Sequence, residues 1–171
     1  QYLKLQMQRI DYSESKESIL TAFSNLNRII QVFPTQERER LNAIYSNRTD
    51  QQIVFNFICF NYTDTLDKCL SLVTSTPATL GSHMFRNQQI NHKVGQVCHV
   101  HGTVEKEMVF GVNDDSQIAK VDIFDCEYGD IYKNMLIKIQ ANASFLENTD
   151  AKAAQMIQNS QLTYIYGMSI G

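Results

Sequence analysis

The chain has 171 residues, of which 43% are hydrophobic and 19% charged, and its net charge is −3. This length suffices for one domain with a sizeable core. The slightly negative charge gives no general attraction to nucleic acid or to an anionic membrane, and no apolar run approaches the ~20 residues of a membrane-spanning helix. Four cysteines without a Cys-x-x-Cys pair predict free thiols and a cytoplasmic protein.

Residues 1–50 are predicted to form a helical insertion or a layer beside the core. Apolar side chains recur every three or four positions over residues 15–33, which predicts an amphipathic helix that ends at Pro34. A second helix is predicted over residues 35–45. Four arginines form either a local basic patch or, as we favour, a solvated helix face: Arg28, Arg38, Arg40 and Arg48.

Residues 51–171 alternate between strand-like and helix-like patterns. Residues 53–60 are an almost unbroken β-branched and aromatic run, typical of a strand covered on both faces. The polar segment 71–93 is predicted to be mostly loop. Further strands are predicted at 96–100, 108–110 and 161–166, and helices at 65–73, 130–145 and 149–159. This alternation predicts an α/β fold with a mainly parallel sheet and flanking helices.

Two polar segments follow predicted strands, where open α/β sheets bind their ligands. Asn61 comes directly after residues 53–60, and its amide is both donor and acceptor, so it either orients a ligand or bonds its own backbone in a turn. His99 and His101 alternate along the next strand and are expected to share a face. Gly102 then lets a ligand or another chain segment approach closely.

The two histidines are open to three interpretations. An imidazole with a pKa near neutrality is a natural general base. Two histidines on one face also bind metal ions, but zinc needs a third ligand and none stands at a suitable spacing, so we predict no metal. The remaining alternative is a structural, hydrogen-bonded pair.

A third polar segment follows the last predicted strand. Gly167 permits close backbone approach, and the Ser169 hydroxyl can meet a phosphate or a ribose. The letters G-x-S-x-G are present, but the helix and triad partners of a serine hydrolase would have to follow them. No glycine-rich phosphate loop is found. If the fold is of the nucleotide-binding type, we expect a partial Rossmann-like domain in an internal piece of a longer chain, with the first strand and glycine-rich loop upstream.

Three motifs occur in order along the chain: Phe60-Asn61-Tyr62-Thr63-Asp64-Thr65-Leu66, His99-Val100-His101-Gly102 and Ile165-Tyr166-Gly167-Met168-Ser169-Ile170-Gly171. Together they resemble the bacterial abortive-infection AbiH family, which is tied to defence against bacteriophage. The resemblance covers residues 53–171. AbiH proteins are in turn similar to sirtuin-like NAD-binding domains.

The resemblance implies a site for NAD. It assigns the contact with the nicotinamide ribose to Asn61, and the base that handles a ribose hydroxyl to His101, which Gly102 follows. Gly167 and Ser169 are the implied contacts to phosphate or ribose. The other residues expected at the nucleotide are Thr63, Asp64 and His99.

The chain departs from the patterns of these families in three respects that bear on chemistry. Thr63 stands where many sirtuin-like sequences carry an acid, and Met168 stands where many AbiH relatives have a histidine. The zinc cysteines of protein-deacylating sirtuins are also absent, which argues against deacylation.

The resemblance leaves two functional hypotheses. In the first, the full-length protein binds NAD and hydrolyses the nicotinamide–ribose bond during phage infection, while the piece alone is inactive. In the second, a module binds a nucleotide or a phage-derived trigger without turnover, and the polar segment 71–93 is its contact surface. The third alternative is an α/β protein whose turn residues neither bind NAD nor sense a ligand. The oligomeric state stays open.

Overall fold

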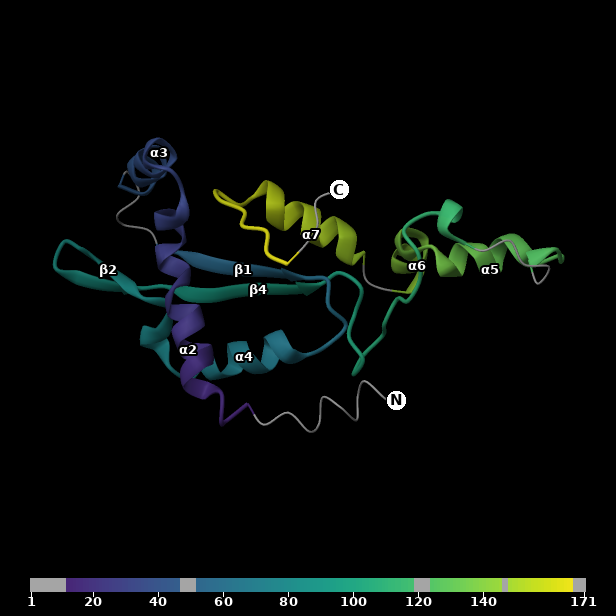
Figure 1. Cartoon of the computed structure of the whole chain (residues 1–171), viewed down its shortest axis with the longest axis horizontal. Coiled ribbons are helices and arrows are strands. Elements are labelled where there is room, and N and C mark those ends of the chain that lie inside the picture. The colour runs from purple at the N-terminus through teal and green to yellow at the C-terminus, as the bar shows by residue number, and fades with distance from the viewer. Residues whose placement is uncertain (1–11, 47–51, 119–123, 146–147, 168–171) are drawn as a thin grey trace. The chain divides into compact units, whose positions relative to one another are not determined.

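The computed structural model describes residues 12–46, 52–118, 124–145 and 148–167. These residues form a mixed α/β structure with a small parallel sheet and flanking helices (Figure 1). The chain divides into two compact units. The first unit comprises Gln1–Phe57 and Thr63–Val97, and the second comprises Ile58–Tyr62 and Cys98–Gly171.

The parallel sheet consists of β1 (Val54–Cys59) and β4 (Lys93–His99), whose arrows point the same way in Figure 1. Both strands run from the first unit into the second. The amide of Lys93 bonds to the carbonyl of Ile53 in the first unit, and that of Val100 bonds to Cys59 in the second. The predicted strands 53–60 and 96–100 are thus confirmed.

A side chain enters the ladder of the sheet between those two hydrogen bonds. The backbone N–H of Gln96 donates to Oδ1 of Asn56 at 2.8 Å, so β4 uses one residue more than β1 over this stretch. A Cβ on Gly95 would lie 2.2 Å from that same Asn56 oxygen. Only glycine leaves room for the inserted amide, which shifts the alternation of side chains along the rest of β4.

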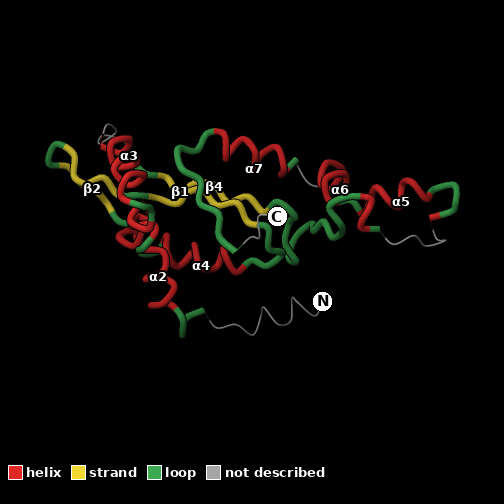
Figure 2. The backbone as a smooth tube through the Cα atoms, turned by 45° about the horizontal axis from the view of Figure 1, so that its top comes forward, coloured by secondary structure: helices red, strands yellow, loops and turns green. Residues whose placement is uncertain are grey.

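The first unit is built around helices α2 (Lys16–Ser24) and α4 (Thr65–Thr74), which pack against each other, and α4 runs beside the strands in Figure 2. Among the residues described in this unit, the buried apolar side chains are Leu70, Val73 and Leu80. The predicted helix 15–33 is α2 followed by the 3₁₀ segment η1 (Leu26–Val32), and the predicted helix 35–45 is α3 (Thr35–Ser46).

Residues 71–93 are more ordered than predicted. Helix α4 ends at Thr74, the short 3₁₀ helix η2 spans Pro77–Leu80, and strands β2 (Ser82–Phe85) and β3 (Gln88–Asn91) pair as an antiparallel hairpin. The prediction of a long loop was wrong because the turn carries no glycine. Arg86 and Asn87 adopt positive φ angles of 46° and 63°, the conformation that a two-residue hairpin turn requires.

In the second unit, α7 (Thr149–Gln158) packs Ala153 and Met156 against Cys98 and Val100 of the β4 region. The predicted helix 149–159 is confirmed. The predicted helix 130–145 is instead two helices, α5 (Gly129–Leu136) and α6 (Lys138–Phe145), which Ile137 separates in an extended conformation.

A chain segment before α5 causes this break. The amide of Val112 bonds to the carbonyl of Leu136, and the amide of Lys138 bonds to the carbonyl of Val112. These bonds take the groups that would continue the helix ladder. A Cβ on Gly111 would lie 2.0 Å from the Leu136 oxygen, so the close approach depends on glycine there. The single 3₁₀ turn η3 (Asp115–Gln117) follows Val112 along the chain.

Two predicted strands are absent from the described part of the chain. Residues 108–110 contribute only an isolated bridge between Met108 and Gly102. Residues 161–166 form no strand, and Tyr164, Ile165 and Tyr166 are 52%, 55% and 87% exposed. A strand needs a neighbour for its backbone N–H and C=O groups, and these apolar residues have none among the described strands.

Candidate functional site

The polar segments that follow β1 and β4 lie side by side in the second unit. Because the strands are parallel, their carboxyl ends meet at the same edge. The Val100 amide bonds to the Cys59 carbonyl at 3.0 Å, and beyond the strands the Val104 amide bonds to the Tyr62 carbonyl at 2.8 Å. We call residues 59–62 and 99–104 the His101 loops. They bring the first two sequence motifs together.

Aromatic rings surround His101 in these loops. The His101 ring lies 5.8 Å from the Phe60 ring, edge to face, and 6.0 Å from the Tyr62 ring. Tyr62 in turn lies 5.3 Å from Phe110, which is 66% exposed. The four rings form a continuous row, and we call them the aromatic row.

One nitrogen of His101 lacks a hydrogen-bond partner among the described residues. Its Nδ1 atom is shielded from solvent and unpaired. Buried polar atoms are nearly always satisfied in folded proteins, because an unpaired one costs about 1–3 kcal/mol. Such an atom marks a place where something other than packing fixes the choice of residue.

The electrostatic surroundings keep the His101 imidazole neutral. Burial lowers its pKa below the ordinary value of 6.5, and the positive charge of Lys138 lowers it further, while Asp150 acts in the opposite direction. A neutral ring at pH 7 has one free lone pair, which is the form that a general base requires.

Helix α7 fixes the β4 side of the loops. Oγ1 of Thr149 donates to the carbonyl of Val100 at 2.8 Å, and the Cys98 thiol donates to the carbonyl of Thr149 at 3.5 Å. Thr149 and Asp150 are both of residue types that cap helices, but the N-cap residue of α7 is Asn148, which makes no side-chain cap. The Thr149 hydroxyl instead holds the residue that precedes His101.

The alternation of His99 and His101 predicted that both lie on one strand, but the structure shows that they do not. Strand β4 ends at His99, which is half-buried, and His101 lies in a turn closed by the Gly102 amide on the His99 carbonyl. The period-two argument for a shared face therefore stops at His99, because it holds only while the backbone stays extended.

The backbone conformation at position 102 and the close approach of a neighbouring chain segment both require glycine there. Its φ is +73°, and a Cβ would lie 1.8 Å from the carbonyl oxygen of Glu107. Gly102 forms a bridge with Met108, and the Val109 amide bonds to the His101 carbonyl at 2.9 Å. Of the two predicted uses of this glycine, the structure shows the approach of another chain segment.

The remaining predicted residues differ in their placement. Asn61 is exposed and stands between the two residues whose rings contact His101, but no hydrogen bond joins its side chain to His101 in the described structure. Gly167 has a φ of +71°, and a Cβ there would meet no described atom within 4 Å. Ser169 lies outside the described residues.

Thr63 and Asp64 belong to the first unit. Thr63 is half-buried. Asp64 is the N-cap residue of α4, although its side chain makes no cap hydrogen bond, and its Oδ2 pairs with Nζ of Lys68 at 3.0 Å. Its Oδ1 is shielded and has no partner in the described part of the chain.

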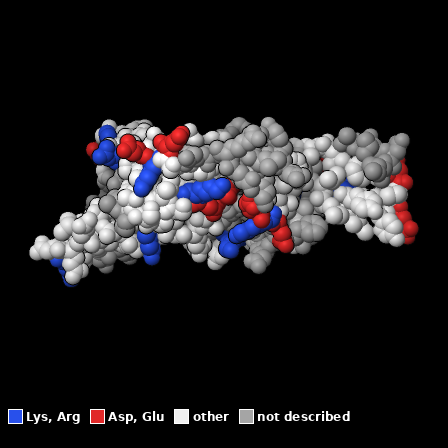
Figure 3. All heavy atoms as spheres, turned by 90° about the horizontal axis from the view of Figure 1, so that it is seen from below, with Lys and Arg blue, Asp and Glu red and all other residues white. Residues whose placement is uncertain are grey.

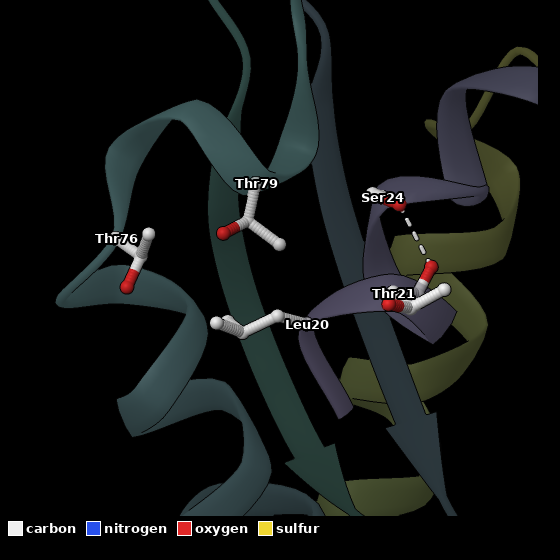
Figure 4. A pocket seen from close by; sticks show the side chains of 5 residues that line it. All are labelled: Leu20, Thr21, Ser24, Thr76 and Thr79. Carbon is white, nitrogen blue, oxygen red and sulfur yellow. Dashed lines mark hydrogen bonds between the residues drawn. The ribbon is translucent and has the colours of Figure 1, made fainter. Parts of the chain in front are cut away.

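A shallow cavity of about 320 Å³ lies in the first unit and contains none of the predicted residues. Four hydroxyl side chains and Leu20 line it, and Ser24 donates to the Thr21 carbonyl at 2.8 Å (Figure 4). The described residues that line it carry no charged group, so we assign no acid–base chemistry to this cavity. The hydroxyl residues are Thr21, Ser24, Thr76 and Thr79.

Charge and metal-ligand patterns add no second site within the described ranges. On the face drawn in Figure 3, acidic and basic side chains lie next to one another. No group of three or more His, Cys, Asp or Glu side chains is placed to hold a metal ion in residues 12–46, 52–118, 124–145 and 148–167. No helix among these residues is both long and apolar enough to cross a membrane.

Sequence reasoning missed the surroundings of His101. Lys138 and Asp150, which act on its charge, are distant in sequence and carried no motif. Phe110 entered only as part of a predicted strand. The sequence signal for Phe60 and Tyr62 was present, because they flank Asn61, but apolar rings beside a strand are ordinarily core residues.

Comparison with known proteins gives one match. The family model described as bacteriophage abortive infection AbiH matches residues 2–171, nearly the whole chain. No curated protein and no solved structure matches it. The family assigned from three short motifs is therefore confirmed over a longer span than those motifs covered. The chain belongs to the AbiH family of bacteriophage abortive infection proteins.

Proposed function

We propose that the full-length protein binds NAD and hydrolyses its nicotinamide–ribose bond as its part in abortive infection. Family membership supports the role in phage defence. His101 is the observation that carries the chemistry. Its imidazole is neutral, lies between two aromatic rings just beyond a parallel strand, and has a shielded nitrogen without a partner among the described residues.

The reaction needs a base and a positioned sugar. The bond between C1′ of ribose and the nicotinamide nitrogen breaks, and its electron pair leaves with nicotinamide. Positive charge develops on the sugar, and water adds to C1′ while losing a proton. In our proposal, His101 accepts that proton or shares the proton of a ribose hydroxyl, a contribution worth about 10²–10⁴-fold in rate.

Other residues supply orientation. The Asn61 amide, which both donates and accepts, is proposed to hold the ribose hydroxyls. The exposed face of Phe110 at the end of the aromatic row offers a surface on which a planar nicotinamide or adenine ring stacks. Gly102 shapes the loop by admitting the Glu107 carbonyl.

The remaining contacts are carried over from the resemblance. Gly167, with its left-handed backbone and open surroundings, and Ser169 are proposed to contact phosphate or ribose. His99 is proposed to complete the site, and Thr63 and Asp64 stay predicted contacts to the nucleotide. The two parallel strands with polar segments at their carboxyl ends support a partial Rossmann-like interpretation of the fold.

The test is nicotinamide release from NAD by the full-length protein, measured by liquid chromatography. His101→Ala is expected to lower the rate at least about 100-fold. His83→Gln, a histidine change in the other unit, is the matched control and should leave the rate unchanged at neutral pH. Unchanged release by His101→Ala would reject the assignment.

A sensor without turnover remains the second candidate, because residues 82–91 form a hairpin that offers a contact surface. Its Met84 is 64% exposed, and the Arg86 guanidinium lies 5.0 Å from the Phe85 ring centroid. This candidate predicts that NAD or a phage component raises the melting temperature while no nicotinamide appears. Product formation with the wild-type protein would favour the enzyme.

A further inference from the structure

Two histidines of the first unit are joined ring to ring. Nδ1 of His83 lies 3.2 Å from Nε2 of His92, and Nδ1 of His92 lies 3.0 Å from the carbonyl oxygen of Leu80. His92 is only 7% exposed. Since His83 belongs to β2 and Leu80 ends η2, His92 links the hairpin to that helix. The His92 amide adds a bond to the Gly81 carbonyl at 3.0 Å.

The chemistry of the acceptors fixes where the hydrogens sit. A carbonyl oxygen only accepts, so Nδ1 of His92 carries a hydrogen whether the ring is neutral or charged. In the neutral ring, Nε2 therefore holds a lone pair. The hydrogen shared by the two rings must then come from Nδ1 of His83.

The pair accommodates one extra proton but not two. A proton added to the far nitrogen of His83 leaves its Nδ1–H free to donate, and the positive charge strengthens that bond. A proton added to Nε2 of His92 as well would set two N–H donors and two positive charges against each other across 3.2 Å. No hydrogen bond exists in that state.

We infer that the His83–His92 pair is a proton-operated latch, which holds the β2–β3 hairpin against η2 until both imidazoles are charged and then releases it. The latch is independent of the proposed NAD chemistry. It makes the contact surface of residues 82–91 sensitive to acid, while the fold around α4 stays in place.

The surroundings of His92 agree with this assignment. Burial is the main cause that lowers its pKa, the bond to Leu80 raises it, and the charge of His83 lowers it again. The ring of Phe55 contacts that of His92, and neither η2 nor β3 contains a titratable residue. Arg86 stacks on Phe85 at the hairpin turn, and Lys93 is exposed.

The test compares hydrogen exchange of the hairpin amides with that of α4 amides in the whole chain, at about pH 7 and about pH 4.5. In the wild type, hairpin protection should fall at least about tenfold relative to α4 on acidification, after correction for intrinsic exchange. In His83→Gln it should not fall, because the amide group donates to neutral His92 and, once rotated, accepts from the charged ring.

Two further measurements keep the assignment open to refutation. Side-chain nitrogen NMR should show a hydrogen on Nδ1 of His92 throughout the titration. His83→Phe, which has no donor, should loosen the hairpin already at neutral pH. Equal loss of protection in the wild type and His83→Gln, or a His92 Nδ1 without its hydrogen at neutral pH, would overturn the latch.

Discussion

His92 and His101 are both shielded imidazoles whose pKa burial lowers, yet they are built in opposite ways. Both ring nitrogens of His92 are within hydrogen-bond distance of a partner, at 3.2 Å and 3.0 Å. His101 is held by rings, and its Nδ1 is unpaired among the described residues. The two hydrogen bonds of His92 explain why a histidine stands there, because they hold neighbouring elements of the fold together. An unsatisfied histidine weakens the fold, and that cost points to a use in chemistry.

The two sites also differ in what surrounds the ring electrostatically. His92 feels chiefly another histidine, so its state depends on how many protons the pair holds. His101 feels the charges of Lys138 and Asp150, so its state is set by burial and by the balance of these two residues. The first arrangement suits a switch, and the second suits a base that stays neutral.

The largest effect on stability is expected at the glycine beside His101. Gly102→Ala combines a φ of +73° with a Cβ 1.8 Å from the Glu107 oxygen, so we expect a loss of about 2–4 kcal/mol in the free energy of unfolding. Gly167→Ala, at a φ of +71° but in open space, should cost only about 1 kcal/mol. Urea denaturation measures both, and equal costs would show that the Glu107 approach is not tight.

Replacing each histidine by leucine tests the contrast directly. His92→Leu removes the hydrogen-bond partner of the buried Leu80 carbonyl and that of Nδ1 of His83. It should lower the free energy of unfolding by about 2–3 kcal/mol. His101→Leu keeps an apolar group against Phe60 and Tyr62 and removes an unpaired nitrogen, so stability should stay within about 0.5 kcal/mol or rise. A larger loss for His101→Leu would mean that its ring has a structural partner.

The stability should fall as the solution becomes acidic below pH 6.5. Both histidines have a pKa below 6.5 in the folded state, so the unfolded chain takes up protons first. Above pH 6.5 neither state gains a proton and the contribution is absent. Below it the slope is at most about 1.4 kcal/mol per pH unit for each histidine.

Denaturation series at several pH values check this expectation. The slope should be smaller in His101→Leu than in the wild type, since one of the titrating groups has been removed. A wild-type stability that rises between pH 6.5 and about pH 5.5 would contradict the direction of both pKa shifts.

The smallest effect is expected at the exposed end of the aromatic row. Phe110→Ala removes a ring that is 66% exposed, so stability should change by less than about 1 kcal/mol. If the ring stacks on a nucleotide, the KM for NAD should rise about 5- to 100-fold at little change in kcat, the range of one stacking contact. Tyr164→Phe, a change at another exposed ring, serves as the control. An unaltered KM would remove Phe110 from the site.

The sequence predicted β1, β4, α3 and α7 because their signals are local. An apolar run of β-branched and aromatic residues, or apolar side chains at helical spacing, needs no knowledge of distant residues. It also predicted that Asn61 and His101 follow strands whose carboxyl ends meet, and the His101 loops do lie together. Ser169 lies outside the described residues, so its part in the site stays a prediction.

The failures share a physical cause, which is that a distant segment supplied the deciding contact. Val112 interrupts the helix predicted over residues 130–145 by taking the Leu136 carbonyl and the Lys138 amide. Strand β4 ends at His99, and His101 lies in a turn whose carbonyl accepts from the Val109 amide, so the alternation on which the His99–His101 argument depended stops there. Residues 161–166 have strand-forming side chains but no neighbouring strand among the described residues.

The sequence by itself determined the family, the parallel strand pair and the presence of polar residues at its edge, because each depends on residue type and spacing along the chain. Only the tertiary structure decided that His101 is neutral, with a nitrogen unpaired among the described residues, and that His92 is paired with His83. Those properties arise from burial and from charges and carbonyl groups brought close by folding, and no one-dimensional pattern records them.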